Sequence, residues 1–112
     1  MKASITASEL KSALAGGTPP LVIDVRRNSA YQASTETIAG ALRRDPEQLA
    51  AWAPELPSAS KVVVYCVHGH EVSQNAAKAL NERGIGAQYL EGGLEEGWKG
   101  SGGALDRKPA GA

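Results

Sequence analysis

The stretch VVVYCVHGHEVS, residues 62–73, changes abruptly from apolar to polar residues. Residues 62–65 are a continuous β-branched and aromatic run, which is typical of a strand buried on both faces of a parallel sheet. A helical pattern runs from about Ser73 to Arg83, with small and apolar residues on one face. The stretch therefore predicts a strand, a polar loop that begins at Cys66, and a helix.

Strands and helices also alternate on both sides of this stretch. Residues 21–25 and 87–90 are further short apolar runs, which predict two more buried strands. The capping box TASE begins a first helix over residues 6–15, and Pro46 begins another. Such alternation is typical of an α/β fold with a mostly parallel central sheet. Ligands of these sheets bind at the carboxyl ends of strands, where Cys66 lies.

Length, charge and hydropathy limit the possible functions. The 112 residues correspond to one domain, which we expect over residues 1–100, with residues 101–112 as a flexible tail. Twelve basic and twelve acidic residues give a net charge of zero, which argues against a nucleic-acid binder. Neither a membrane span nor the apolar core of a secretion signal is present in the sequence. We therefore expect no nucleic-acid or membrane partner, and a cytoplasmic location.

Cys66 is the only cysteine, so it forms neither an intrachain disulfide nor a cysteine-rich zinc site. Backbone N–H groups of a strand-to-helix loop can form an anion-binding nest, and the helix N-terminus adds partial positive charge. Both effects favour a reactive thiolate. Gly69 would supply the positive φ that a tight loop requires. The alternative is that Cys66 is a buried structural cysteine. However, the residues that follow Cys66 are polar, which favours a reactive thiol.

Two histidines, His68 and His70, flank Gly69 in the same loop. Either one could exchange a proton with Cys66, or both could be exposed residues that shape the site. The pattern Cys-x-His-x-His also suggests a metal site. However, three ligands within five residues fit tetrahedral zinc poorly, so we expect no metal. The sequence implies no bound organic cofactor either.

Four short motifs occur in an order and spacing that resemble the rhodanese family of sulfurtransferases. They are LVIDVR (21–26), IAGA (38–41), CVHG (66–69) and LEGG (90–93) followed by Trp98. The resemblance covers residues 5–100. It implies a three-layer rhodanese-like fold, with a central mostly parallel sheet and helices on both faces.

The resemblance also implies a mechanism. Cys66 would be the catalytic residue, attacking the outer sulfur of thiosulfate or another donor to form a persulfide. A thiol or cyanide would then accept the sulfur, and a protein is a further candidate acceptor. The active-site loop would continue through Val67, His68, Gly69, His70, Glu71 and Val72.

The loop departs from the family pattern after Gly69. Many members have Arg five positions after the cysteine and Ser or Thr at the sixth, whereas here Glu71 and Val72 occupy these positions and Ser73 follows. A carboxylate beside the nucleophile would oppose thiolate formation and repel thiosulfate. One additional residue before Trp98 is expected to lengthen the preceding turn.

Other charged residues are expected near the site. Arg43 and Arg44 could clamp an anionic donor in place of the missing Arg, or could belong to a solvated turn. Asp24 and Arg26 are expected in structural roles, as an acceptor of backbone N–H groups and as the partner of an acid. Ser73 is expected to cap the helix. The acidic residues at 91, 95 and 96 are expected to form a solvated face.

Three other functions remain open. A phosphatase or arsenate reductase of this fold requires Cys-x5-Arg, but the sixth position after Cys66 is Val72. A non-catalytic or regulatory binding module would not need the thiol. A redox sensor would need a thiol from another molecule, because this chain has no second cysteine.

Overall fold

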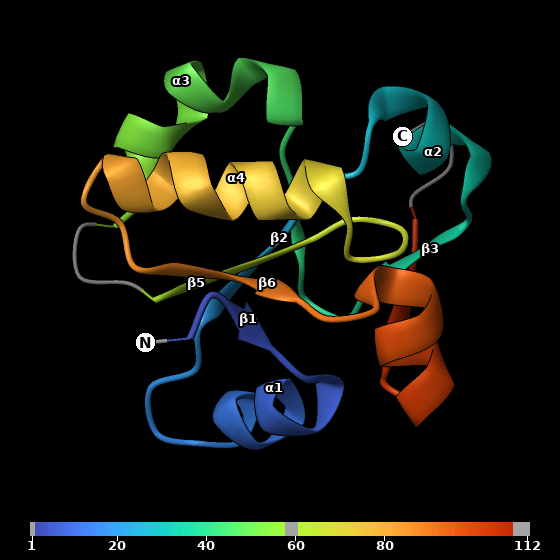
Figure 1. Cartoon of the computed structure of the whole chain (residues 1–112). Coiled ribbons are helices and arrows are strands. Elements are labelled where there is room, and N and C mark those ends of the chain that lie inside the picture. The colour runs from blue at the N-terminus through green and yellow to red at the C-terminus, as the bar shows by residue number, and fades with distance from the viewer. Residues whose placement is uncertain (1, 58–60, 109–112) are drawn as a thin grey trace.

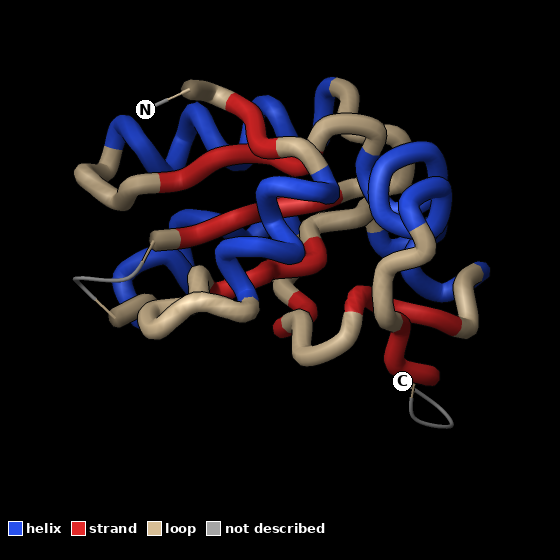
Figure 2. Tube along the Cα trace, turned by 90° about the horizontal axis from the view of Figure 1, so that it is seen from below, coloured by secondary structure: helices blue, strands red, loops and turns tan. Residues whose placement is uncertain are grey.

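The computed structural model describes residues 2–57 and 61–108, and its centre is one five-stranded sheet. The strand order is β1-β6-β5-β2-β4, and every neighbouring pair is parallel. The strands are β1 (Ser4–Ile5), β2 (Leu21–Asp24), β4 (Leu42–Arg43), β5 (Val62–Tyr65) and β6 (Ala87–Leu90) (Figure 1). Figure 2 shows the strands side by side. The expected α/β fold and its parallel sheet are confirmed.

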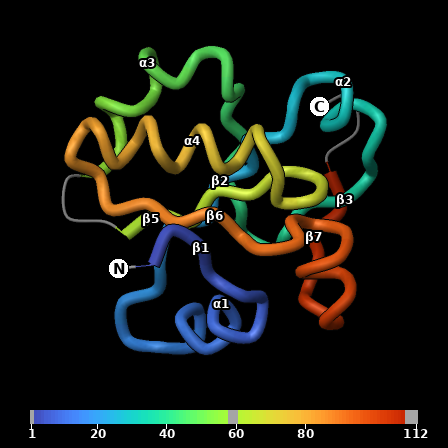
Figure 3. Tube along the Cα trace, viewed as in Figure 1, coloured from blue at the N-terminus to red at the C-terminus, as the bar shows by residue number. Residues whose placement is uncertain are grey.

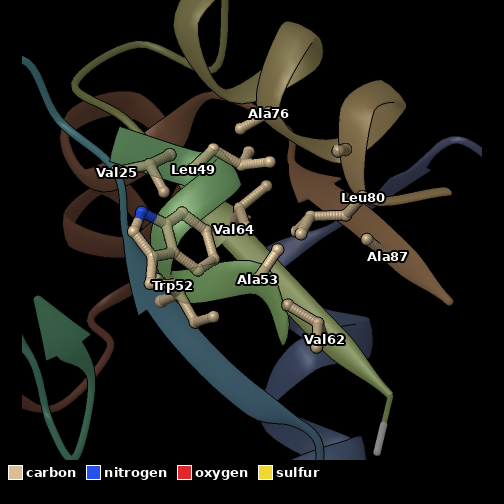
Figure 4. Packing of buried hydrophobic residues seen from close by; sticks show 11 residues of the cluster. Val25, Leu49, Trp52, Ala53, Val62, Val64, Ala76, Leu80 and Ala87 are labelled. Carbon is tan, nitrogen blue, oxygen red and sulfur yellow. The ribbon is translucent and has the colours of Figure 1, made fainter. Parts of the chain in front are cut away.

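Helices cover both faces of the sheet. Helices α3 (Leu49–Trp52) and α4 (Glu71–Glu82) lie on one face, and α1 (Ala7–Leu14) lies on the other (Figure 1). Alternate residues of β5 enter the two cores. Val62 and Val64 pack with α3 and α4, as Figure 4 shows, whereas Val63 and Tyr65 pack on the α1 side. This alternation explains the uninterrupted apolar run, and the three-layer arrangement is confirmed.

The side-chain caps predicted at two helix starts are confirmed. Thr6 forms the capping box with Glu9 before α1, and this hydrogen bond lowers the pKa of Glu9. The Asp45 side chain accepts the N–H of Glu47 at the start of the 3₁₀ turn η1 (Pro46–Gln48). Another 3₁₀ turn, η2 (Ala53–Glu55), follows α3.

Helix α4 begins two residues earlier than the apolar pattern indicated. Gln74 donates its N–H to the carbonyl of His70, which brings Glu71 and Val72 into the first turn. The short loop between β5 and α4 therefore consists of residues 66–70. Glu71 lies in the first turn, where a carboxylate interacts favourably with the helix dipole.

The carboxyl-terminal region differs from the expected flexible tail. Strand β7 (Leu105–Arg107) pairs antiparallel with β3 (Glu36–Ile38), and Figure 3 shows them beside each other. Trp98 donates its indole N–H to the carbonyl of Ala104, which ties this segment to the core. Residues 109–112 lie outside the described part of the chain.

Three further elements surround the carboxyl edge of the sheet. Helix α2 (Asn28–Ala33) follows β2, and no side chain caps its start. After β6, the chain forms the π-helical segment η3 (Gly93–Trp98) and the 3₁₀ turn η4 (Lys99–Ser101). The longer turn expected before Trp98 is thus a π-helix, whose wider turn accommodates an additional residue.

Candidate active site

Cys66 directly follows β5, at the carboxyl edge of the sheet, and its side chain is buried with 5% exposure. Its thiol lies 3.1 Å from the hydroxyl oxygen of Ser73. Ser73 is fully buried in the first turn of α4, and α4 has no side-chain cap. The expectation that Ser73 caps the helix is therefore wrong, because its hydroxyl contacts the thiol instead.

The start of η3 holds the carbonyl groups of the loop. Leu94 donates its N–H to the carbonyl of Cys66 (2.9 Å), and Glu95 donates to the carbonyl of Val67 (3.0 Å). The N–H of a trans peptide points opposite to its carbonyl, so the N–H groups that follow these two carbonyls point away from η3. The loop is thus oriented by a turn that comes 28 residues later in the chain.

The third contact in this register joins side chains. His68 Nδ1 lies 2.7 Å from Oε2 and 2.8 Å from Oε1 of Glu96. Residues 66, 67 and 68 therefore contact residues 94, 95 and 96 in order, and we call these three contacts the clasp. The hydrogen bond from His68 lowers the pKa of Glu96, which keeps its carboxylate charged.

Two glycines allow the loop and the turn to approach closely. Gly69 and Gly93 have φ of +73° and +59°. A Cβ at Gly93 would lie 2.5 Å from the carbonyl oxygen of Cys66, and one at Gly69 would lie 2.7 Å from the nitrogen of Gly92. The expectation of a positive φ at Gly69 is confirmed, and its close packing adds a second reason for glycine there.

Several backbone N–H groups of the loop after Cys66 and of the first turn of α4 remain available. Among the residues that the structure describes, none of the N–H groups of 67–73 donates a hydrogen bond to a protein acceptor. Those of residues 71–73 belong to the first turn of α4, where helix geometry leaves them unpaired. Consecutive amides of this kind bind anions, including a thiolate or a sulfur-borne charge.

A buried ion pair lies at the end of the neighbouring strand. Arg26 donates from Nε and Nη2 to the carboxylate of Asp24, with a shortest distance of 2.7 Å, and from Nη2 to the carbonyl of Glu36. Asp24 also accepts the backbone N–H of Arg26. Burial opposes the charge of Arg26, but the hydrogen bonds and charge of Asp24 outweigh it and raise the pKa of Arg26. The contacts are those of a structural pair.

Arg43 and Arg44 make local contacts at the end of β4. The guanidinium of Arg43 donates to the carbonyls of Asp24 and Arg44 and lies 4.4 Å from the ring centre of Tyr31. Arg44 donates to the carbonyl of Arg43. These contacts hold both side chains against the backbone, and an anion-binding role for them stays a prediction.

Three cavities adjoin the loop and the start of α4, whose polar side chains line two of them. His68, Gly69 and His70 line one of about 510 Å³, together with Ser4, Tyr89, Glu91, Gly92 and Glu96. Glu71 and Val72 line another of about 810 Å³, which extends along α4 toward α3 and the start of α2. The histidines of the loop and Glu71 at the start of α4 therefore face two separate openings.

The acidic residues after β6 are exposed, as expected, and each also makes a contact at the surface. Glu91 accepts the hydroxyl of Ser4 (2.6 Å), and Glu95 pairs with Lys99 (3.1 Å). Glu96, which the sequence analysis did not consider for the site, binds His68. The additional residue before Trp98 was the available signal that this turn is unusual.

Within residues 2–57 and 61–108, no group of three or more His, Cys, Asp or Glu side chains is arranged to hold a metal ion. No helix in that same part of the chain is long and apolar enough to cross a membrane.

Comparison with known proteins identifies the family. A sequence profile of the Rhodanese-like domain matches residues 6–100. The chain belongs to the rhodanese-like domain family. No protein with a curated description matches it. A possible tyrosine phosphatase from Rhodopseudomonas palustris shares the fold. It is 24% identical, with a TM-score of 0.75 over 92% of this chain and 83% of that one.

Solved structures of other members resemble this rhodanese-like domain over nearly its whole length. A rhodanese-related protein from Thermoplasma volcanium is 25% identical, with a TM-score of 0.79 over 94% of this chain and 98% of that one. A rhodanese-like domain protein from Staphylococcus aureus is 26% identical, with a TM-score of 0.79 over 97% and 100%. The β-strands, helices and loop described above therefore form a rhodanese-like domain.

Proposed function

We propose that this rhodanese-like domain is a sulfurtransferase in which Cys66 carries the transferred sulfur as a persulfide. The observation that carries the proposal is the environment of the thiol. It contacts the buried hydroxyl of Ser73, and the N–H groups of residues 67–73 have no protein acceptor among the described residues. Such surroundings favour a thiolate and a charged terminal sulfur.

The first step is an attack of the Cys66 thiolate on the outer sulfur of the donor. With thiosulfate, a bond forms between Sγ and the outer sulfur, while the bond within thiosulfate breaks and sulfite leaves with its electrons. The hydroxyl of Ser73 donates a hydrogen bond to the thiolate before the attack. The loop amides then bind the negative charge on the terminal sulfur of the persulfide.

The second step transfers this sulfur to an acceptor. A thiolate or cyanide forms a bond to the outer sulfur, and the bond between the two sulfurs of the persulfide breaks to restore the Cys66 thiolate. We propose a cytoplasmic setting, where small-molecule and protein thiols stay reduced and can act as acceptors. No cofactor, nucleic acid or membrane enters this scheme.

Glu71 bears on the choice of donor. Its carboxylate lies in the first turn of α4, five residues after Cys66, and it is exposed. Negative charge here disfavours a dianionic donor such as thiosulfate. We therefore propose a donor of lower negative charge as the efficient substrate, with thiosulfate as a slow one.

A non-catalytic binding module is the alternative function. The 5% exposure of Cys66 is the observation that favours it, because a buried thiol meets donors slowly. A phosphatase is less consistent with the site, since Val72 provides no charge to bind the oxyanion at the position that such enzymes use for Arg.

Intact-protein mass spectrometry tests the proposal. The chain is incubated with thiosulfate or with an organic persulfide, and Cys66→Ser is the matched control. A gain of one sulfur atom on the native chain alone, reversed by cyanide, is the expected result. If neither donor adds sulfur, or if Cys66→Ser gains it equally, the sulfurtransferase assignment is wrong and the binding module remains.

A further inference from the structure

The contact between His68 and Glu96 has no role in the persulfide chemistry described above. Both side chains are exposed: 50% of the His68 side chain and 62% of the Glu96 side chain are accessible to solvent. Side chains this exposed usually stay mobile, yet Nδ1 of His68 lies within hydrogen-bond distance of both carboxylate oxygens. The imidazole is thus held in one orientation at the surface of the active-site loop.

The backbone on both sides of this contact is also fixed. His68 follows Val67, whose carbonyl accepts the N–H of Glu95, and Glu96 follows Glu95. The clasp therefore places the imidazole two residues from Cys66 on a loop whose conformation it sets. Glu96 lies within the π-helical segment η3, in register with His68.

The carboxylate determines which ring nitrogen is available. Since Glu96 is charged, Nδ1 of a neutral His68 carries the hydrogen and donates it to Glu96, and Nε2 retains its lone pair. Within the described residues, Nε2 has no hydrogen-bond partner. A carboxylate on Nδ1 also stabilises the imidazolium that forms when Nε2 takes up a proton.

We propose that His68, oriented by Glu96, is the general base that deprotonates the thiol acceptor in the second half of the reaction. This inference rests on the proposed function. Nε2 takes the proton of the acceptor thiol, and the resulting thiolate forms a bond to the outer sulfur of the Cys66 persulfide. The sulfur–sulfur bond to Cys66 breaks, the Cys66 thiolate leaves, and the imidazolium returns its proton to water. Glu96 is a positioning residue.

The cavity beside the loop gives the acceptor access to this base. Its volume of about 510 Å³ accommodates a small organic thiol, and His68 and Glu96 both line it. The other titratable groups that face this cavity are His70 in the loop, Tyr89 on β6 and Glu91 after it. The His70 ring centre lies 6.0 Å from that of His68. Neither this ring nor Tyr89 is hydrogen-bonded to His68 in the described residues.

The expected pH dependence follows from where the acceptor loses its proton. With His68 as the base, the acceptor thiol is deprotonated within the site, so the transfer does not depend on thiolate already present in solution. Without the base, the rate depends on the fraction of acceptor already present as thiolate, so it rises with pH up to the pKa of that acceptor. The advantage of the native chain is therefore largest near neutral pH and disappears in alkaline buffer.

The experiment separates loading from transfer. The persulfide is loaded first and measured by intact mass, and its decay is then followed with a small thiol and, separately, with a phosphine. A phosphine attacks sulfur without losing a proton, so it does not need a base. For His68→Asn, the ratio of the thiol rate to the phosphine rate is expected to fall about 100-fold near neutral pH, at the low end of general-base effects.

A matched pair of variants tests the role of Glu96. Glu96→Gln keeps a hydrogen-bond acceptor but removes the charge, and a fall of about tenfold in the same ratio is expected. Glu55→Gln makes the same change at an exposed side chain of η2, outside the clasp, and is expected to leave the ratio unchanged.

The outcomes distinguish the two proposals. Loading of the persulfide with an unchanged thiol-to-phosphine ratio in His68→Asn would overturn the role of His68 and leave the sulfurtransferase intact. An equal fall with both acceptors would also overturn it, because the loop rather than the proton transfer would then be damaged. Failure to load the native chain would overturn both proposals together.

Discussion

Replacement of Arg26 by methionine tests how far the buried ion pair stabilises the edge of the sheet that carries the site. Arg26 and Asp24 are 1% and 0% exposed, and their charges are joined at 2.7 Å. Arg26→Met removes the three contacts from the guanidinium to Asp24 and the one to the carbonyl of Glu36. Within the described part of the chain, the Asp24 carboxylate then retains one hydrogen bond, from the N–H of residue 26.

The expected loss is large because a charge remains buried. Removing one partner of a buried pair destabilises a protein by about 3–5 kcal/mol. A domain of this size has a free energy of unfolding of roughly 5–15 kcal/mol, so the variant would lose a substantial share of it. At about 4 °C or more per kcal/mol, Tm would fall by roughly 12 °C or more.

Urea unfolding followed by tryptophan fluorescence measures this loss. Trp52 and Trp98 are both buried, in the cores on opposite faces of the sheet, so their emission reports on the whole domain. The control is Arg27→Met, which removes an adjacent but exposed arginine and is expected to change stability by less than about 0.5 kcal/mol.

A double variant separates the charge from the packing. Asp24→Leu combined with Arg26→Met removes both charges, and its stability is expected to exceed that of Arg26→Met alone. A loss below about 1 kcal/mol in the single variant would refute the argument, because it would mean that the remaining carboxylate is solvated or protonated at little cost. A double variant that loses the full sum of the two single effects would refute it as well.

Three other predictions concern the loop and its surroundings. Gly93→Ala is expected to lower the free energy of unfolding by about 1–2 kcal/mol because of the positive φ alone, and further because its Cβ would contact the carbonyl of Cys66. Persulfide loading is expected to be lost as well. An unchanged urea midpoint would contradict the close packing. Glu71→Gln is expected to lower the KM for thiosulfate roughly threefold at low salt and less at high salt; equal values at low salt would mean that the carboxylate does not face the donor. In an NMR titration, the pKa of the Glu96 carboxyl is expected to lie below that of an ordinary Glu. The contact with His68 then holds above this pKa and is lost as the pH falls through it. The pKa shift should largely disappear in His68→Asn.

Strong local signals in the sequence determine much of this fold. The β-branched run at 62–65 and the capping box at Thr6 act over a few residues, and both predicted the elements found. The position of Cys66 followed from the same local pattern, because a strand followed by a polar loop and a helix places that residue at the sheet edge.

The features that the sequence analysis missed depend on distant residues. The segment LDR at 105–107 has no strand pattern of its own and becomes a strand by pairing with residues 36–38. Predicting the contact of Ser73 with the thiol would have required the correct start of α4. Polar residues in the first turn of that helix hid this start in the sequence pattern. Glu96 contacts His68 from the π-helical segment η3, 28 residues further along the chain. Tertiary pairing outweighs local preference in each case.

The clasp has a consequence for the order in which the chain matures. During synthesis, β5 and Cys66 leave the ribosome well before residues 94–96, so the thiol exists for a time without the turn that orients its loop. Until η3 docks, the loop amides have no fixed direction and the cysteine is an ordinary thiol. Under the proposed function, the site around Cys66 is therefore complete only when the carboxyl-terminal third of the domain has folded.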